Sequence, residues 1–234
     1  MRDAVTRADF IAAAVAATAA PHAGGRDLWA EVTISREGTA LLAPFTVAIA
    51  MHNATGHAQR LRFPTADLFR VDVLHDDNPV WSSVTGHRPI PITRTLDVAP
   101  GTLRLAQVIV DSTTDDRRAY APGKYTVRVA LLGTNFGAVV DRSISFDPPG
   151  TTAQALAAKP GTVLTIAGTP YVDGGYARLR DASGSIRLSH ALGLRPTGVW
   201  IVRGFLDAQG DERVFDVGRS APAFDNGPPA TPPS

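Results

Sequence analysis

Apolar and polar residues alternate over residues 28–146, which is the pattern of β-strands that bury one face. A first strand is predicted at 28–34. In the next one, Phe45, Val47 and Ile49 share one side. Further strands are predicted around these apolar sets: Leu61 and Phe63; Phe69, Val71 and Val73; Val80 and Trp81; Leu96 and Val98; Leu103, Leu105 and Ile109; Tyr125, Val127, Val129 and Leu131; and residues 142–146.

Turn residues separate these strands, for example at 53–56, 76–79 and 100–101. Short strands at this spacing are typical of an immunoglobulin-like antiparallel β-sandwich, because alternate residues then face a core between two sheets. We assign this unit to residues 26–147. A register slip of one residue would turn every apolar set toward water, so the pattern constrains the pairing strongly.

A second β-rich unit follows a proline-bracketed linker at 148–160, within which 152–158 can form one or two helical turns. Residues 161–222 contain five strand signals, with Gly168 after the first and Gly204 within the fourth. Five strands with such kinks predict a small closed barrel, which makes the whole fold class all-β. The tail, 223–234, has no apolar period and is predicted to be disordered.

Residues 1–25 have the features of a secretory signal peptide. Two arginines precede the apolar run 10–20, and Ala17–Ala19 fits a small-residue cleavage site. We therefore expect a periplasmic or secreted protein. The alternative is a short amphipathic helix on a cytoplasmic protein, which Asp3 and Asp9 favour. The run is too short to span a bilayer and no other segment is long or apolar enough, so no membrane span is expected.

Charge and composition exclude several classes of partner and chemistry. The chain has 234 residues, 23 basic and 22 acidic side chains, and no cysteine. A net charge of +1 gives no general attraction to nucleic acid, and the lack of cysteine excludes disulfides and thiolate chemistry. Residues 161–221 hold seven arginines against six acidic residues, so we expect no nucleic-acid partner. The barrel aromatics that could still stack on bases are Tyr171, Tyr176, Trp200 and Phe205, and the arginines that could gather on one barrel face are Arg178, Arg180 and Arg187.

The motifs and residue spacings of the sequence indicate no reactive centre. The sequence has no nucleophile elbow, zinc-binding helix, phosphate-binding loop or dinucleotide fingerprint. His52, His57 and His75 lie beside turns, and nothing in their spacing fixes the geometry of a metal site. Ser189 and His190 are neighbours on one predicted strand and should face opposite ways. We therefore expect no catalytic residues, no metal and no cofactor, and predict that the chain is not an enzyme.

Four segments together resemble the intracellular proteinase inhibitor (BsuPI) domain family over about residues 45–133. They are Asn53–Thr65 (NATGHAQRLRFPT), Asp67–Leu74 (DLFRVDVL), Asn78–Ser82 (NPVWS) and Tyr120–Gly133 (YAPGKYTVRVALLG). The resemblance implies a loop offered to the active site of a protease. Within residues 162–221, the segments VLTIAG, YARLRDASGSIRL and GVWIVRGFL resemble an oligonucleotide/oligosaccharide-binding (OB) barrel.

The residues predicted to bind a partner lie in and around the segment 82–94, with 111–122 as a second candidate loop. Trp81 is interpreted first as a core residue and alternatively as an edge anchor for the partner. The functional prediction is a protein-interaction module for a protein partner, with a protease as its specific form. The alternative is an extracytoplasmic ligand-binding or envelope-structural protein, and the sequence predicts no oligomeric state. The predicted partner-binding residues are Trp81, Ser82, Ser83, His87, Arg88, Ile90, Ile92 and Arg94.

Overall fold

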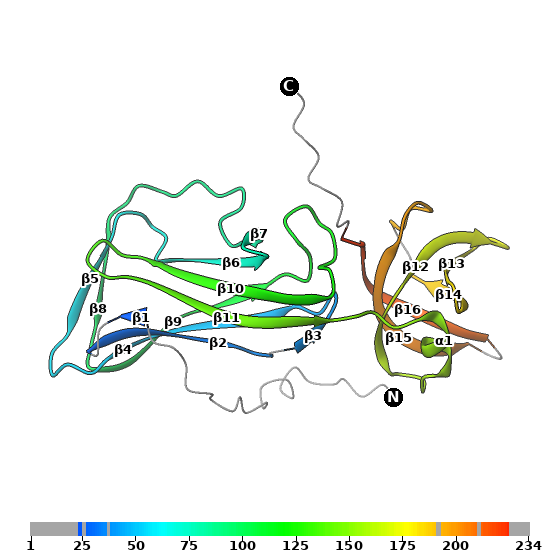
Figure 1. Cartoon of the computed structure of the whole chain (residues 1–234), viewed down its shortest axis with the longest axis horizontal. Coiled ribbons are helices and arrows are strands. Elements are labelled where there is room, and N and C mark those ends of the chain that lie inside the picture. Colours follow the sequence, from blue (N-terminus) through cyan, green and yellow to red (C-terminus); the bar gives the residue numbers. More distant parts are fainter. Residues whose placement is uncertain (1–22, 25–26, 37, 191–192, 210–211, 225–234) are drawn as a thin grey trace, which may run out of the picture.

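The computed structural model describes residues 23–24, 27–36, 38–190, 193–209 and 212–224. Two layers of strands lie beside a smaller barrel (Figure 1), and the prediction of an all-β fold is confirmed. The signal-like segment and the tail lie outside the described residues, apart from 23–24 and 223–224.

Two sheets form the larger part, which we call the two-sheet unit (residues 23–147). The first has the order β1-β2-β4-β9, with strands Ala23–Gly24, Leu28–Ile34, Phe45–Asn53 and Gly101–Val110. The second has the order β3-β11-β10-β6-β7, with strands Gly38–Ala40, Gly137–Asp147, Gly123–Leu132, Phe69–His75 and Asn78–Ser82. A separate pair, β5 (Gln59–Phe63) and β8 (Arg94–Val98), lies at the end far from the barrel (Figure 1).

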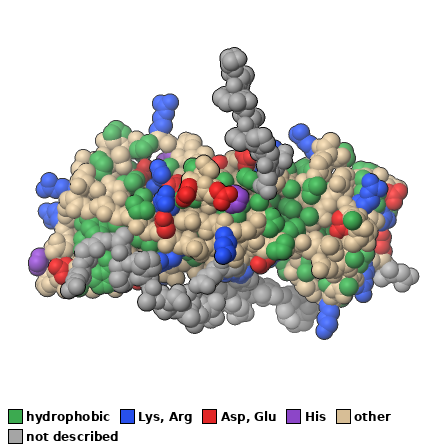
Figure 2. Space-filling view, viewed as in Figure 1, with side chains coloured by type: hydrophobic (Ala, Val, Ile, Leu, Met, Phe, Trp, Pro, Cys, Tyr) green, Lys and Arg blue, Asp and Glu red, His purple; other side chains and the backbone are tan. Residues whose placement is uncertain are grey.

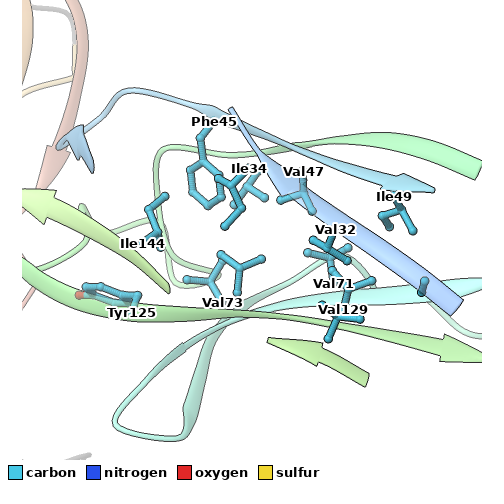
Figure 3. Close-up of a cluster of buried hydrophobic side chains, with 14 of the residues drawn as sticks. Val32, Ile34, Phe45, Val47, Ile49, Val71, Val73, Tyr125, Val129 and Ile144 are labelled. Carbon is cyan, nitrogen blue, oxygen red and sulfur yellow. The ribbon is translucent and has the colours of Figure 1, made fainter. Parts of the chain in front are cut away.

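The core of this unit comes from the predicted alternation. Along β4 every second residue is buried, and the same holds for β10 up to Leu131. Figure 3 shows side chains from both sheets meeting, with Val47 and Ile49 from one layer and Val71 and Val129 from the other. Burying each such side chain contributes about 1.5–3 kcal/mol, so the two layers hold each other in place.

One strand pair departs from the antiparallel expectation. The chain leaves the first sheet after β2 and enters the second as β3, which pairs in parallel with Ser145–Asp147 of β11. This short parallel pair departs from the antiparallel pairing that the alternation predicts for the rest of the unit.

The β6–β7 hairpin determines where the predicted partner-binding loop, residues 83–93, begins. Its turn residues Asp76 and Asp77 both have positive φ, at 49° and 63°. This conformation suits a tight hairpin turn, and aspartate tolerates it better than most side chains. The hairpin makes β7 the edge strand of its sheet, and the chain continues from Ser82 into residues 83–93.

The second part is a closed barrel (residues 163–222) with the order β12-β13-β14-β16-β15. Its strands are Val163–Asp173, Tyr176–Asp181, Gly184–Ser189, Glu212–Pro222 and Trp200–Gln209, and β14 runs parallel to β16. The pairing shifts by one residue at Arg203 and Gly204, where the backbone of β16 comes so close that a Cβ on Gly204 would collide with the carbonyl oxygen of Asp216. Glycine is therefore required at this bend.

The predicted helical segment is present as α1 (Thr152–Ala157). Thr151 and Gln154 form a capping box at its start. Ala155 is fully buried in the barrel core, and the Thr152 hydroxyl donates a hydrogen bond of 2.8 Å to Asp181. The helix therefore packs against the barrel and does not act as a free linker.

Direct contacts join the two-sheet unit and the barrel. Ile201 and Ala221 of the barrel belong to the same buried cluster as the core between the sheets. The backbone N–H of Ala119 donates to the carbonyl of Pro222 at 2.9 Å, and the Thr165 hydroxyl donates to the carbonyl of Leu41 at 3.0 Å. The barrel thus packs against one end of the two sheets (Figure 1).

A candidate partner-binding loop

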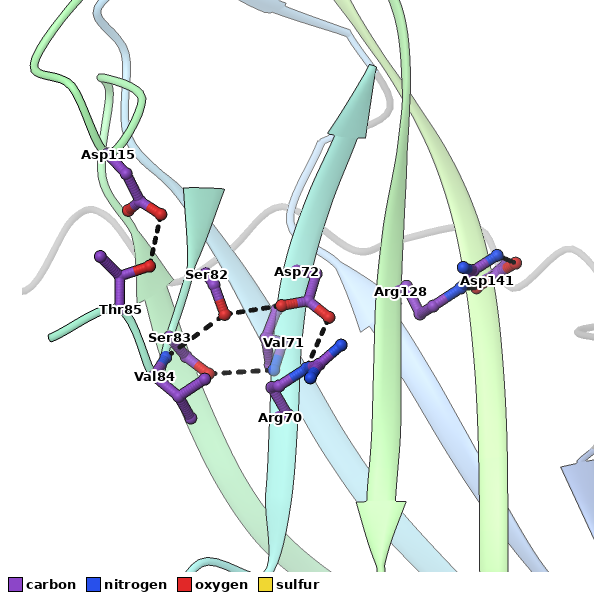
Figure 4. A network of polar contacts seen from close by, with 10 residues as sticks. All are labelled: Arg70, Val71, Asp72, Ser82, Ser83, Val84, Thr85, Asp115, Arg128 and Asp141. Atoms are coloured by element: carbon purple, nitrogen blue, oxygen red, sulfur yellow. Dashed lines mark hydrogen bonds and ion pairs between the residues drawn. The ribbon is translucent and has the colours of Figure 1, made fainter. Parts of the chain in front are cut away.

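The 83–93 loop connects β7 to β8 and contains most of the predicted partner-binding residues. Its entry is held by hydrogen bonds to β6 (Figure 4). The Ser83 hydroxyl accepts from the backbone N–H of Val71 at 3.0 Å, and the Ser83 N–H donates to the carbonyl of Val71 at 2.8 Å. Ser83 therefore continues the strand pairing for one residue beyond β7.

Ser82 binds a buried carboxylate at the same place. Its hydroxyl donates to Asp72 at 2.6 Å, and Arg70 donates to the other carboxylate oxygen at 2.7 Å. Asp72 is only 3% exposed, although it belongs to the outer face of its sheet. Removing one partner of such a buried charge costs several kcal/mol in general, so this contact fixes the start of the loop.

A row of alternating polar and charged residues extends this contact across the outer face of the second sheet. Ser82 lies opposite Asp72, Asp72 opposite Arg128, and Arg128 opposite Asp141. The Arg128 guanidinium donates two hydrogen bonds of 2.9 Å to the Asp141 carboxylate, and this pairing raises the pKa of Arg128. Each charge therefore has an opposite charge or a hydroxyl beside it in the row.

The second predicted loop, 111–122, packs against the entry of the 83–93 loop. The Asp115 N–H donates to the carbonyl of Val80 at 2.9 Å, and the Thr85 hydroxyl donates to the Asp115 carboxylate (Figure 4). Within this second loop the Thr114 N–H donates to the carbonyl of Arg118 at 2.9 Å. The structure thus brings the two candidate loops together.

Beyond Thr85 the side chains of the loop point into solvent. His87 and Arg88 are exposed, and Ile90 and Ile92 keep 53% and 57% of their surface accessible. The Ile90 carbonyl accepts hydrogen bonds from the N–H groups of Ala66 at 3.0 Å and Ile92 at 2.7 Å. The backbone is therefore held at its middle while both isoleucine side chains stay exposed.

The predicted site residues thus fall into two groups. Trp81, Ser82 and Ser83 anchor the loop, and Trp81 is half-buried against the core on the edge strand β7. Ser83 is itself exposed, and the other exposed residues of the site are His87, Arg88, Ile90, Ile92 and Arg94. Sequence reasoning did not identify Asp72, because its burial depends on the register that sets Ser82 opposite it.

The barrel gathers aromatic and basic side chains on one outer face. Arg178 and Arg187 lie opposite each other on β13 and β14. The Arg187 guanidinium lies 3.6 Å from the centre of the Tyr176 ring, and Glu212 pairs with both arginines, at 3.6 and 2.6 Å. Their charge is therefore partly neutralised within the face. In Figure 2 the basic side chains of the visible face likewise stand apart and form no continuous patch.

Ser189 and His190 differ from their prediction. His190 has a positive φ of 54°, which turns its side chain back toward β16. As a result the Ser189 hydroxyl and His190 Nδ1 both contact the same carboxylate oxygen of Asp216, at 2.9 and 2.8 Å. The hydrogen bond from His190 lowers the pKa of Asp216, which a second bond from Ser189 lowers further. The prediction that the two side chains face opposite ways was wrong.

The three histidines considered as metal ligands are engaged separately. His52 contacts Glu31 at 2.5 Å, the His57 carbonyl accepts from Asn53, and His75 stacks on Tyr125. Within the described ranges, no three histidine or acidic side chains come together as metal ligands. Among the same residues, no helix has the length and apolar character needed to cross a membrane.

Comparisons with known proteins add little. No protein-family model matches the chain, and no curated protein matches it. Two solved structures are similar over 51% of the chain. One is a β-glucosidase from Erythrobacter marinus, with 13% identity and a TM-score of 0.31. The other is a β-glucosidase from Listeria innocua, with 12% identity and a TM-score of 0.30. The chain spans 15% and 16% of those two enzymes.

The expectation that the chain is not an enzyme is contradicted by these two matches, and we withdraw it. At such TM-scores the similarity gives no argument for glycosidase activity or for a particular catalytic residue.

Proposed function

We propose that the chain is a protein-interaction module that binds a protein partner through the 83–93 loop. One observation carries this proposal: the loop is anchored at its entry and middle, yet it presents Ile90 and Ile92 to solvent. Exposed apolar side chains on a held backbone lose little conformational entropy on binding, which favours their use as contact residues.

A proteinase inhibitor is the specific form of this proposal, and it rests on the resemblance to the BsuPI family. The loop sequence Pro89-Ile90-Pro91-Ile92 supports it, because the residue before a proline prefers an extended backbone. An exposed and anchored segment can enter a protease cleft and resist cleavage there. Export to the periplasm or the medium, proposed from the N-terminal residues, would place the protein among secreted proteases.

The test is inhibition of a panel of serine, cysteine and metalloproteases by the full chain at stoichiometric excess. Wild-type protein should inhibit at least one protease, and the double variant Ile90→Asp/Ile92→Asp should not. Ile109→Asp is the matched control, since Ile109 is 71% exposed but lies on the edge strand β9. If wild-type protein leaves every protease fully active, the inhibitor form is wrong.

The second candidate is ligand binding by the barrel, within an extracytoplasmic or envelope-structural protein. The observation that favours it is the outer face on which Arg187 lies over Tyr176, since an aromatic ring beside a guanidinium can hold a planar or anionic ligand. We further propose that the two-sheet unit is immunoglobulin-like, which its two facing sheets support, and that the barrel is OB-like, which its closed five-strand order supports.

A further inference from the structure

Three arginines meet where the two-sheet unit joins the barrel. On the barrel, Thr165, Arg203 and Arg219 lie side by side on neighbouring strands β12, β15 and β16. The Arg203 guanidinium donates to the Thr165 hydroxyl at 2.9 Å, and this hydroxyl donates to the carbonyl of Leu41 in the two-sheet unit. Arg219 reaches the same unit by donating to the Ser112 hydroxyl at 2.7 Å. Thr165, Arg203 and Arg219 therefore lie on the side of the barrel that faces the two-sheet unit.

Arg36 completes the cluster from the two-sheet unit, just beyond the end of β2. Burial lowers the pKa of Arg203, and the positive charges of Arg36 and Arg219 lower it further. Arg203 therefore lies opposite Arg219 on the neighbouring strand and within electrostatic range of Arg36. Arg203 is half-buried, while Arg36 and Arg219 are exposed, so solvent reaches the cluster from one side.

Acidic side chains balance little of this charge. Asp111 lies 3.5 Å from Arg219, and in the described part of the chain neither Arg36 nor Arg203 has an ion pair. Keeping the half-buried Arg203 guanidinium near two other positive charges, with no carboxylate of its own, is unfavourable. An anion bound among them would remove both the repulsion and the cost of burial.

We propose that Arg36, Arg203 and Arg219 form a binding site for a phosphate group at the junction of the two-sheet unit and the barrel. Guanidinium groups match the oxygens of phosphate by paired hydrogen bonds. A phosphate group carries between about one and two negative charges near pH 7, which suits three arginines that share one carboxylate. This site is independent of the partner-binding loop, so either proposal can fail without the other.

The experiment is calorimetric titration of the full chain with inorganic phosphate, with ionic strength held constant by sodium chloride. We expect saturable binding to wild-type protein. Arg36→Gln, which leaves the hydrogen bond from Arg203 to Thr165 intact, should weaken phosphate binding by about tenfold because one charge-assisted contact is lost. Arg203→Gln should abolish it, with folding checked by circular dichroism. Arg104→Gln, an exposed arginine on β9, is the matched control and should bind phosphate like wild type.

Two further arms identify the source of the phosphate. Glycerol 3-phosphate binding more tightly than inorganic phosphate would assign the site to a phosphomonoester, and the reverse would assign it to the free anion. Glu37, next to Arg36 in the sequence, lies outside the described residues. If phosphate binds only to the Glu37→Gln variant, a carboxylate of this chain satisfies the cluster and the proposal is wrong. Absence of saturable binding in wild type and in Glu37→Gln would also overturn it.

Discussion

The hydroxyl of Thr85 donates a hydrogen bond to the carboxylate of Asp115, 30 residues later in the chain. This contact ties the entry of the 83–93 loop to the 111–122 loop. The second loop in turn bonds to the barrel through Ser112 and Ala119. The barrel thus contributes to the support of the candidate loop, although it lies in a different part of the fold.

Removing this tie should loosen the loop without unfolding the protein. Thr85→Val keeps the shape of the side chain but removes the donor, and loss of such a bond costs about 1 kcal/mol. We expect faster hydrogen exchange at residues 83–93 and an unchanged exchange rate in β4. Thr95→Val, at an exposed position of β8, is the control. Equal exchange in both variants would show that the tie does not hold the loop.

Two tyrosines near the junction, Tyr120 and Tyr125, meet edge to face and should respond differently to loss of their hydroxyls. The Tyr120 hydroxyl is buried and has no hydrogen-bond partner among the described residues, and its burial strongly raises the pKa of the group. The Tyr125 hydroxyl donates to the carbonyl of Ala121 at 3.0 Å, and burial raises its pKa to about 12. Tyr120→Phe should leave the free energy of unfolding unchanged or raise it by up to about 1 kcal/mol, whereas Tyr125→Phe should lower it by about 1 kcal/mol. Urea denaturation measures both, and the opposite order would contradict these assignments.

Gly204 tests the close approach of strands in the barrel. A methyl group there meets the backbone of Asp216, so Gly204→Ala should destabilise the barrel by about 1–3 kcal/mol or more. Gly218→Ala, on the neighbouring strand, meets no atom closer than 3.7 Å and serves as the control. Thermal denaturation followed by circular dichroism compares the two. Equal melting temperatures would mean that the bulge can adjust to a side chain.

Asp181 should make the stability of the barrel depend on pH in the acid range. Partial burial would raise its pKa, but hydrogen bonds from Ser183 and Thr152 outweigh this and lower it to about 2. An unfolded aspartate titrates near 3.9, so the unfolded chain takes up the proton first. The free energy of unfolding should therefore fall as the pH drops from about 5 to 2. In Asp181→Asn this acid-dependent loss should be smaller, and an identical pH profile for the two proteins would contradict the assignment.

Sequence reasoning predicted what depends on local alternation and missed what depends on register. The apolar period of Phe45, Val47 and Ile49 was enough to predict β4. The strands on either side predicted a loop at 82–94, and the exposure of Ile90 and Ile92 within it comes from the structure. Burial of Asp72 could not be predicted, since it requires the pairing that brings Ser82 opposite. The contact of His190 with Asp216 likewise follows from a left-handed backbone conformation that no pattern in the sequence indicates.

The most direct test of the partner-binding loop is site-specific photocrosslinking in the cells that make the protein, with a benzophenone side chain at position 92 or at position 109. Both positions are exposed, and only the first lies in the loop. We predict a defined adduct from position 92 that is absent from position 109. An excess of unlabelled wild-type protein should compete it away, and Ile90→Asp protein should not. The same adducts from both positions, or equal competition by the variant, would contradict the assignment of the 83–93 loop as the binding surface.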